Sequence, residues 1–151
     1  MKVIFFGLIL FFFIGHNTGN SQTWTVYNIS NSLIPADYVR DLVVDSLNNL
    51  WVATPYGLGK FDGSNWTEFN SSNSPLPSGD CRSLFIDSEQ NIWVGLNYGY
   101  VFKYSNGSTW TDYSTNYTSD VNAINQDLDG NIWVGHSSGL EKLVDSNWVN
   151  F

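Results

Sequence analysis

Short apolar runs alternate with polar turns along most of the chain, and the same order of runs and turns recurs about every 40 residues. The clearest marker is an Asn-Leu/Ile-Trp-Val-Ala/Gly segment, which occurs three times around Trp51, Trp93 and Trp133. An aspartate lies six residues before each of these tryptophans, and a glycine lies six residues after it. A repeat of this length that carries strand-type motifs predicts the blades of a β-propeller rather than a helical array.

A second tryptophan motif, Trp-x-x-Tyr/Phe, occurs four times, at Trp24–Tyr27, Trp66–Phe69, Trp110–Tyr113 and Trp148–Phe151. Its two aromatic residues are three positions apart, so on a strand they point to opposite faces of the sheet. Both faces of each sheet therefore need a neighbour, which stacked blades supply.

Each unit divides into four strands. The first strands are predicted at Val39–Val44, Arg82–Ile86 and Val121–Asn125, and the second strands carry the first-motif tryptophans. The third strands are predicted at Leu58–Phe61, Tyr100–Tyr104 and Leu140–Val144, and turns such as Asp62-Gly63 and Asn106-Gly107 lead into the fourth. The sequence thus predicts an all-β fold, a partial β-propeller of three four-stranded antiparallel blades at residues 37–70, 79–113 and 119–151.

The N-terminal residues 1–21 have the layout of a secretory signal peptide, with Lys2, the apolar run Val3–Ile14 and a polar exit. Twelve apolar residues fall short of the roughly 20 that a membrane-spanning helix needs. Residues 22–36 then form an orphan outer strand and a linker. We therefore expect export to the periplasm or the extracellular space, without membrane insertion of the mature chain.

The net charge and the cysteine content argue against several classes of function. The formal net charge is −8, and an acidic surface repels nucleic-acid phosphates and anionic lipids. The single cysteine, Cys81, occupies an apolar strand position and is expected to be a buried, inert thiol. The chain contains no nucleotide-binding motif and no paired-cysteine metal motif, so no cofactor is expected.

Candidate ligand-binding residues come from the loops between second and third strands. In an antiparallel four-stranded blade, these loops share a face with the connectors between blades. Tyr56 and Tyr98 occupy equivalent places in successive blades and are candidates for stacking on a sugar or contacting a peptide. His136 and Ser137 lie on the same face. The alternative is that these are turn residues that pack on neighbouring loops.

The sequence gives only weak indications of metal binding or catalysis. The segment from Asp127 to Asn131 resembles the start of a calcium loop, but it lacks the later ligands and coincides with a hairpin turn of every unit. No metal site is predicted there. His136 lies directly before two serines, and adjacent residues in a tight turn are poorly placed to form a nucleophile–base pair. No catalytic residues are therefore predicted.

The Asn-Ile-Trp-Val-Gly segment, the following Gly-Leu, the Phe-Asp-Gly turn and Trp-Thr-x-Phe together resemble the two-component regulator propeller repeat. The resemblance extends from about Trp24 to Phe151. It implies an exported β-propeller of sensor type, as found in the periplasmic part of hybrid histidine kinases and in other exported bacterial proteins.

Three blades are too few for a closed ring, which generally has four to eight. Two expectations remain open: further blades are missing downstream, or a homodimer completes one ring from three plus three blades. The predicted function is a non-catalytic exported propeller segment that binds a carbohydrate or protein ligand, as the sensory part of an envelope signalling system. The alternatives are a fragment of a larger propeller enzyme of polysaccharide lyase or hydrolase type, or a truncated product without independent function.

Overall fold

The computed structural model describes residues 25–77 and 79–151, and the predicted signal peptide at residues 1–21 lies outside them. The described residues form three antiparallel sheets of four strands each, which we call blade 1 (β1–β4), blade 2 (β5–β8) and blade 3 (β9–β12). The strands are β1 (Asp41–Val44), β2 (Leu50–Thr54), β3 (Gly57–Phe61), β4 (Trp66–Phe69), β5 (Cys81–Ile86), β6 (Ile92–Leu96), β7 (Val101–Ser105), β8 (Thr109–Asp112), β9 (Val121–Gln126), β10 (Ile132–His136), β11 (Gly139–Val144) and β12 (Asn147–Asn150). A short 3-10 turn, η1 (Asn97–Gly99), precedes β7. No helix among the described residues is long and apolar enough to cross a membrane.

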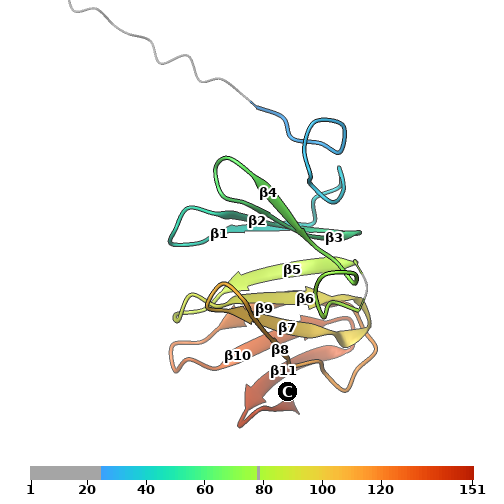
Figure 1. Cartoon of the computed structure of the whole chain (residues 1–151). Coiled ribbons are helices and arrows are strands. Elements are labelled where there is room, and N and C mark those ends of the chain that lie inside the picture. The colour runs from blue at the N-terminus through green and yellow to red at the C-terminus, as the bar shows by residue number, and fades with distance from the viewer. Residues whose placement is uncertain (1–24, 78) are drawn as a thin grey trace, which may run out of the picture.

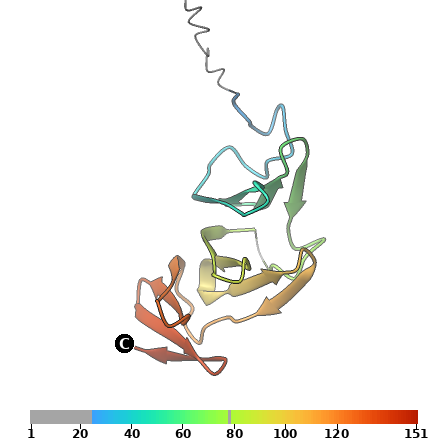
Figure 2. The ribbon, with the colours of Figure 1, turned by 90° about the vertical axis from the view of Figure 1, so that its left-hand side faces the viewer.

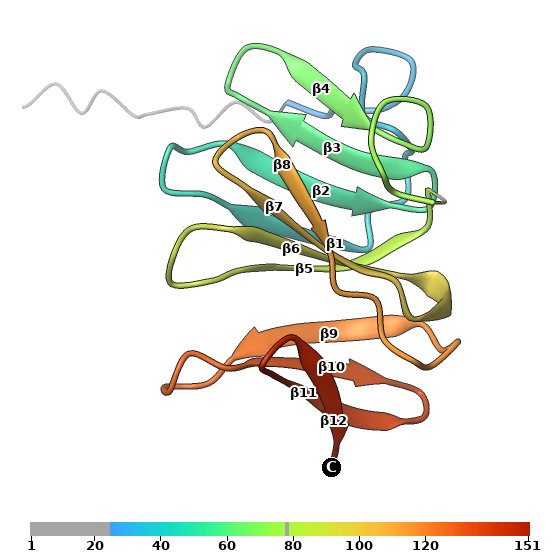
Figure 3. The same ribbon diagram turned by 60° about the horizontal axis from the view of Figure 1, so that its bottom comes forward.

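The three sheets follow one another in chain order, with blade 2 between blades 1 and 3 (Figures 1 and 3). The first strands lie closest together, because β5 contacts both β1 and β2, and β9 contacts both β5 and β6. Seen from the side, the sheets succeed one another along an open arc (Figure 2). The predicted fold class is confirmed, and the predicted strand ends lie within two residues of the observed ones.

Tight turns define the hairpins, and their residues explain why the strands end where they do. The fourth residue of each Asp-containing turn has a left-handed backbone, with φ of 64° at Asn48, 66° at Gln90 and 87° at Gly130. The turn between β7 and β8 has two such residues, Asn106 and Gly107, as expected for a type I′ hairpin. Asparagine and glycine tolerate this conformation well, which is why the sequence marks these turns clearly.

The core lies between the blades rather than within them. Trp51 of blade 1 packs in a buried cluster with blade 2, and Trp93 of blade 2 packs in a second cluster with blade 3. Both tryptophans are almost fully buried, with 2% and 3% of their surface exposed. Cys81 is buried in the first cluster, and burial raises the pKa of its thiol to about 12. Each blade is therefore stabilised chiefly by its neighbour.

The predicted outer strand starts at Trp24, outside the described residues, and the described part of this segment packs against blade 1 without forming a strand. Residues 25–40 contain no strand, because an outer strand needs the third strand of its own blade as a pairing partner. The ring of Tyr27 nevertheless lies against Phe61 and Trp66 of blade 1, at centroid distances of 5.1 and 5.6 Å. Phe69 contacts Tyr104 and Trp110 of blade 2 in the same way, at 5.6 and 5.8 Å. Tyr27 thus occupies the place that the end of a preceding outer strand would take.

Candidate ligand-binding face

The loops between second and third strands lie on the same face as the connectors between blades, as predicted; we call this the loop face. The backbone N–H of Thr115, in the connector to blade 3, donates to the carbonyl of Gly99 at 2.8 Å. In blade 1, Gly79 lies so close to the backbone of Tyr56 that a β-carbon there would be 2.4 Å from the Tyr56 carbonyl carbon. These contacts hold each loop against a connector.

Tyr56 and Tyr98 point into solvent from this face. Their exposed fractions are 72% and 63%. Tyr98 has a left-handed backbone, with φ 56° and ψ 27°, which is an unfavourable conformation for a bulky residue. An exposed aromatic residue in a strained conformation is a candidate for a role outside the fold.

A hollow of about 350 Å³ lies beside Tyr56. The N-terminal segment supplies one wall, and the loop of blade 1 supplies the other. Tyr38 is exposed at its rim, and the Arg40 guanidinium lies 5.6 Å from the Tyr38 ring centroid. The remaining lining is largely apolar and comprises Ile29, Pro35, Ala36, Asp37 and Pro55.

His136 differs from the expectation that it contacts a ligand. Only 1% of its side chain is exposed, and its Nε2 lies 3.2 Å from Oε2 of the equally buried Glu141. The backbone N–H of Ser138 lies 3.2 Å from His136 Nδ1, so both ring nitrogens have a polar partner. The ring of Tyr117 lies 4.9 Å from the imidazole. These contacts hold the blade 3 loop in place, whereas Ser137 is exposed on the loop face.

A row of ion pairs joins the three blades at the start of their first strands. Arg40 of blade 1 lies 2.8 Å from Asp80, at the entry to blade 2. Arg82 of blade 2 lies 3.2 Å from Asp80 and 2.8 Å from Asp120, at the entry to blade 3. Both arginines of the described chain therefore form ion pairs between blades.

The three lysines of the described chain each lie over a first-motif tryptophan. The distances from Nζ to the ring centroids are 5.2, 5.5 and 5.1 Å for Lys60 on Trp51, Lys103 on Trp93 and Lys142 on Trp133. Such cation–π contacts stabilise the ammonium group against the ring face. Because the basic groups are engaged internally, the surface offers chiefly carboxylates and neutral polar groups to a ligand.

The Asp-containing turns lie on the opposite face, which we call the turn face. The Asp127 carboxylate accepts hydrogen bonds from Trp133 Nε1 at 2.9 Å, from the backbone and side-chain amides of Asn131 and from the backbone of Asp129. The Trp133 hydrogen bond holds the pKa of Asp127 well below its usual value, although partial burial opposes the shift. This carboxylate is a structural acceptor, as the hairpin interpretation predicted.

The other two blades repeat this arrangement. Trp51 Nε1 donates to Asp45 at 3.0 Å, and Trp93 Nε1 donates to Asp87 at 2.8 Å. Burial raises the pKa of Asp45, but the hydrogen bonds from Trp51, Asn49 and the turn backbone outweigh burial, so the net shift is downward. The aspartates therefore fix the tryptophan rings at the blade interfaces.

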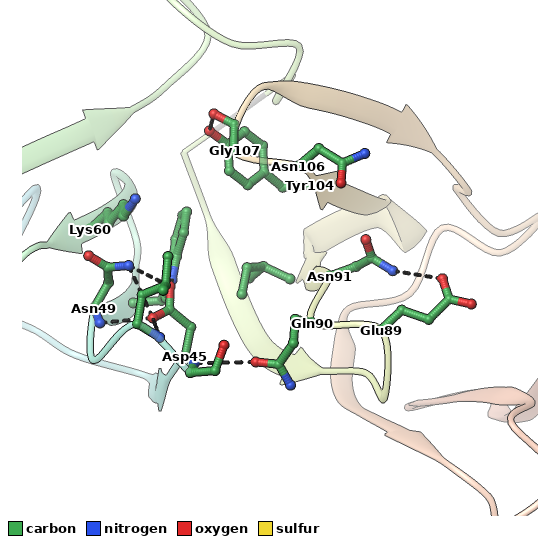
Figure 4. Close-up of a pocket in the computed structure, with 13 residues that line it drawn as sticks. Asp45, Asn49, Lys60, Glu89, Gln90, Asn91, Tyr104, Asn106 and Gly107 are labelled. Carbon is green, nitrogen blue, oxygen red and sulfur yellow. Dashed lines mark hydrogen bonds between the residues drawn. The ribbon is translucent and has the colours of Figure 1, made fainter.

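A second hollow, which sequence reasoning did not predict, lies on the turn face between blades 1 and 2. It has a volume of about 350 Å³, and Lys60, Glu89 and Asn106 are among the residues around it (Figure 4). The backbone N–H of Ser46 donates to Gln90 Oε1 at 3.2 Å across the two turns. This hydrogen bond joins the turns of adjacent blades below the hollow.

Sequence reasoning also missed Tyr38 and the paired connectors. The segment from Asn28 to Pro35 and the segment from Asn70 to Pro77 share the pattern Asn-x-Ser-Asn-Ser-x-Ile/Leu-Pro. Their hydrogen bonds match, since the Ser32 hydroxyl donates to the Asn28 carbonyl as the Ser74 hydroxyl does to that of Asn70. Comparing connectors as well as strands would have placed residues 28–36 against blade 1, and Tyr38 beside the loop face.

Comparisons with known proteins agree with this architecture. A family model described as two component regulator propeller matches residues 33–56, and no curated protein matches the chain significantly. Solved structures with similar folds include the extracellular domains of the putative hybrid two component systems BT3049 and BT4673 from B. thetaiotaomicron. The first is 20% identical with a TM-score of 0.73, over 85% of this chain and 18% of that one. The second is 17% identical with a TM-score of 0.75, over 87% of this chain and 18% of that one.

Virginiamycin B lyase from Staphylococcus aureus is 16% identical with a TM-score of 0.60, over 70% of this chain and 38% of the lyase. The chain thus spans about a fifth of the two extracellular domains and about two fifths of the lyase. At these identities the likeness concerns the fold, which sensor domains and an enzyme share. Together with the family match, it identifies the chain as a propeller-type fold with a two-component regulator propeller repeat at residues 33–56.

Proposed function

We propose that this chain is an exported, non-catalytic propeller segment whose loop face binds an uncharged carbohydrate. The observation that carries the proposal is the pair of exposed tyrosines, Tyr56 and Tyr98, at equivalent loop positions of adjacent blades. A tyrosine ring packs against the C–H face of a sugar, and its hydroxyl group hydrogen-bonds the sugar's hydroxyls. A concave, largely apolar surface with a few polar groups beside Tyr56 provides the rest of such a site.

The charge distribution supports an uncharged ligand. Arg40 and Arg82 are held in ion pairs, and the lysines lie over tryptophan rings. An anionic sugar would therefore meet a surface with few available cations and many carboxylates. The sensory role in an envelope signalling system is supported by the likeness to extracellular domains of two component systems, and it requires a signalling partner.

Titration of the protein with neutral oligosaccharides, followed by calorimetry or amide chemical shifts, tests the proposal. The double variant Tyr56→Ala/Tyr98→Ala should weaken binding at least tenfold, since it removes both stacking platforms. Leu47→Ser on the turn face is the control, because Leu47 is an apolar residue on the opposite face and is exposed to 83%. Binding of peptides but of no oligosaccharide would refute the carbohydrate assignment, and unchanged binding by the double variant would refute the site.

Tyr98→Asn separates a binding role from a structural one. Asparagine tolerates the left-handed conformation, so relief of strain should stabilise the fold by about 0.5–1 kcal/mol. Ligand affinity should fall at the same time, which is the usual trade-off at a functional site. If Tyr98 served the fold instead, the variant would unfold at a lower urea concentration than the wild type.

A further inference from the structure

The open face of blade 3 carries the same side chains that the other blades use to contact their successors. Trp133 lies against Lys142 and against Phe151, whose ring centroid is 4.9 Å away and whose surface is 71% exposed. In blade 1, the equivalent Trp51 and Phe69 are stacked at 5.9 Å and covered by blade 2. The face of blade 3 is therefore a contact surface that has no partner among the described residues.

The two contacts inside the chain show what covers such a face. Phe69 of blade 1 inserts between Tyr104 and Trp110, which belong to the third and fourth strands of blade 2. At the next contact, Trp148 Nε1 on the fourth strand of blade 3 donates to the Tyr113 carbonyl at the end of blade 2. The complementary surface is thus the third- and fourth-strand aromatic pair of another blade of this repeat.

Blade 1 presents this pair, Phe61 and Trp66, at the other end of the molecule. Tyr27 covers the pocket but does not satisfy Trp66, whose Nε1 is buried without a hydrogen-bond partner among the described residues. At the opposite edge of the same sheet, β1 also leaves Leu42 and Val44 exposed. Blade 1 therefore has a hydrogen-bond donor without an acceptor and uncovered apolar surface. An incoming blade would supply the acceptor and cover the surface.

We propose that the open face of blade 3 docks on blade 1 of a second copy of this chain. Phe151 enters the pocket between Phe61 and Trp66 of that copy and displaces its Tyr27. The contact is head-to-tail, so it either closes a ring of two copies or continues into larger assemblies. Tyr27 acts as an intramolecular competitor, which keeps the association of the wild-type chain weak.

Sedimentation velocity on the protein expressed from its full-length sequence tests this contact. Tyr27→Ser frees the pocket and should lower the dissociation constant for self-association at least tenfold, whereas Tyr27→Phe should behave as the wild type. Tyr27→Ser/Phe151→Ser has a free pocket but no side chain to fill it, so it should remain monomeric. Mixed with the wild type, this double variant should form a complex of one copy of each, because only Phe151 of the wild type can enter its free pocket.

A second measurement does not depend on the folding of Tyr27→Ser. The indole N–H resonance of Trp66 should move as wild-type protein is concentrated, since the group gains an acceptor, and it should stay constant in Phe151→Ser. A monomeric Tyr27→Ser with native circular dichroism would overturn the proposal. So would self-association that persists in the double variant, or a Trp66 resonance that does not respond to concentration in the wild type.

Discussion

Replacing Trp93 and Trp133 separately by phenylalanine measures how much of each blade's stability comes from the blade beside it. Both tryptophans donate to an aspartate of their own turn, at 2.8 Å to Asp87 and 2.9 Å to Asp127. Both also lie under a lysine. They differ in surroundings, because Trp93 is buried against blade 3, whereas Trp133 is partly exposed on the open face.

The expected losses follow from that difference. At Trp93, removal of a buried hydrogen bond to a carboxylate costs about 1.5–3 kcal/mol. Loss of the outer ring atoms adds about 1 kcal/mol, so Trp93→Phe should lower the free energy of unfolding by roughly 3 kcal/mol. Trp133 is partly exposed, so in the Trp133→Phe variant water can hydrogen-bond the Asp127 carboxylate and occupy part of the space of the lost ring atoms. The free energy of unfolding should therefore fall by about 1 kcal/mol or less.

Urea unfolding followed by far-ultraviolet circular dichroism measures both losses under the same conditions. The dependence on urea should have the same slope in all three proteins, since the surface exposed on unfolding is nearly unchanged. Equal losses at the two positions would refute the reasoning. They would mean that the tryptophan stabilises its own blade and that the neighbouring blade contributes little.

Three further predictions use single positions. Gly95→Ala should cost about 1–3 kcal/mol in urea unfolding, because its β-carbon would lie 2.4 Å from Ser83 Oγ, whereas Gly135→Ala, with 3.6 Å to the nearest atom, should be neutral. Equal effects would refute that packing argument. The folded-state pKa of Asp127 lies below its usual value of 3.8, so its contribution to stability is present above that pH and is lost as pH falls further. Asp127→Asn should therefore flatten the decline of stability below about pH 4, and an unchanged acid titration would contradict this. The Cys81 thiol, with its pKa raised to about 12, should react with iodoacetamide at pH 8 only when urea unfolds the protein, and rapid labelling of native protein would contradict its burial.

The strands and hairpins were predictable because each repeat has the same residue types at the same turn and strand positions. The Asp, Asn and Trp positions recur with fixed spacing, and they form the same hydrogen bonds in all three blades. The lysines over the tryptophans recur as well, at Lys60, Lys103 and Lys142, and a comparison of the three units contains that signal. Repetition in the sequence thus corresponds to repetition in contacts between neighbouring blades.

The contacts that were not predicted fall where the repeats differ. The position before each of these lysines is Gly59, Phe102 and Glu141. The glycine makes room for Pro35, whose Cδ would be 3.0 Å from a β-carbon at that position. Glu141 instead binds His136, which makes the histidine a buried hydrogen-bond partner. Such pairings depend on which side chains meet across a hairpin, and no single repeat position specifies them.

The residues of the loop face differ from the blade contacts in how far the fold determines them. Each loop ends in a glycine with positive φ, at Gly57, Gly99 and Gly139, because the backbone requires it there. The residue before that glycine is tyrosine in blades 1 and 2 but Ser138 in blade 3. The fold tolerates either, so the fold alone does not determine the residue at this position.

The proposed binding and self-association use different side chains, although the N-terminal segment that walls the hollow beside Tyr56 also carries Tyr27. The tyrosines of the loop face belong to blades 1 and 2, whereas Phe151 and the pocket for it lie at the two ends of the blade series. Changes at Tyr56 or Tyr98 alter no contact of Phe61, Trp66 or Phe151. A ligand on the loop face would still span adjacent blades, whose relative position depends on their shared core and on the Arg–Asp row between them. Because a propeller segment gains its rigidity from such neighbours, an added blade would make the loop face more rigid.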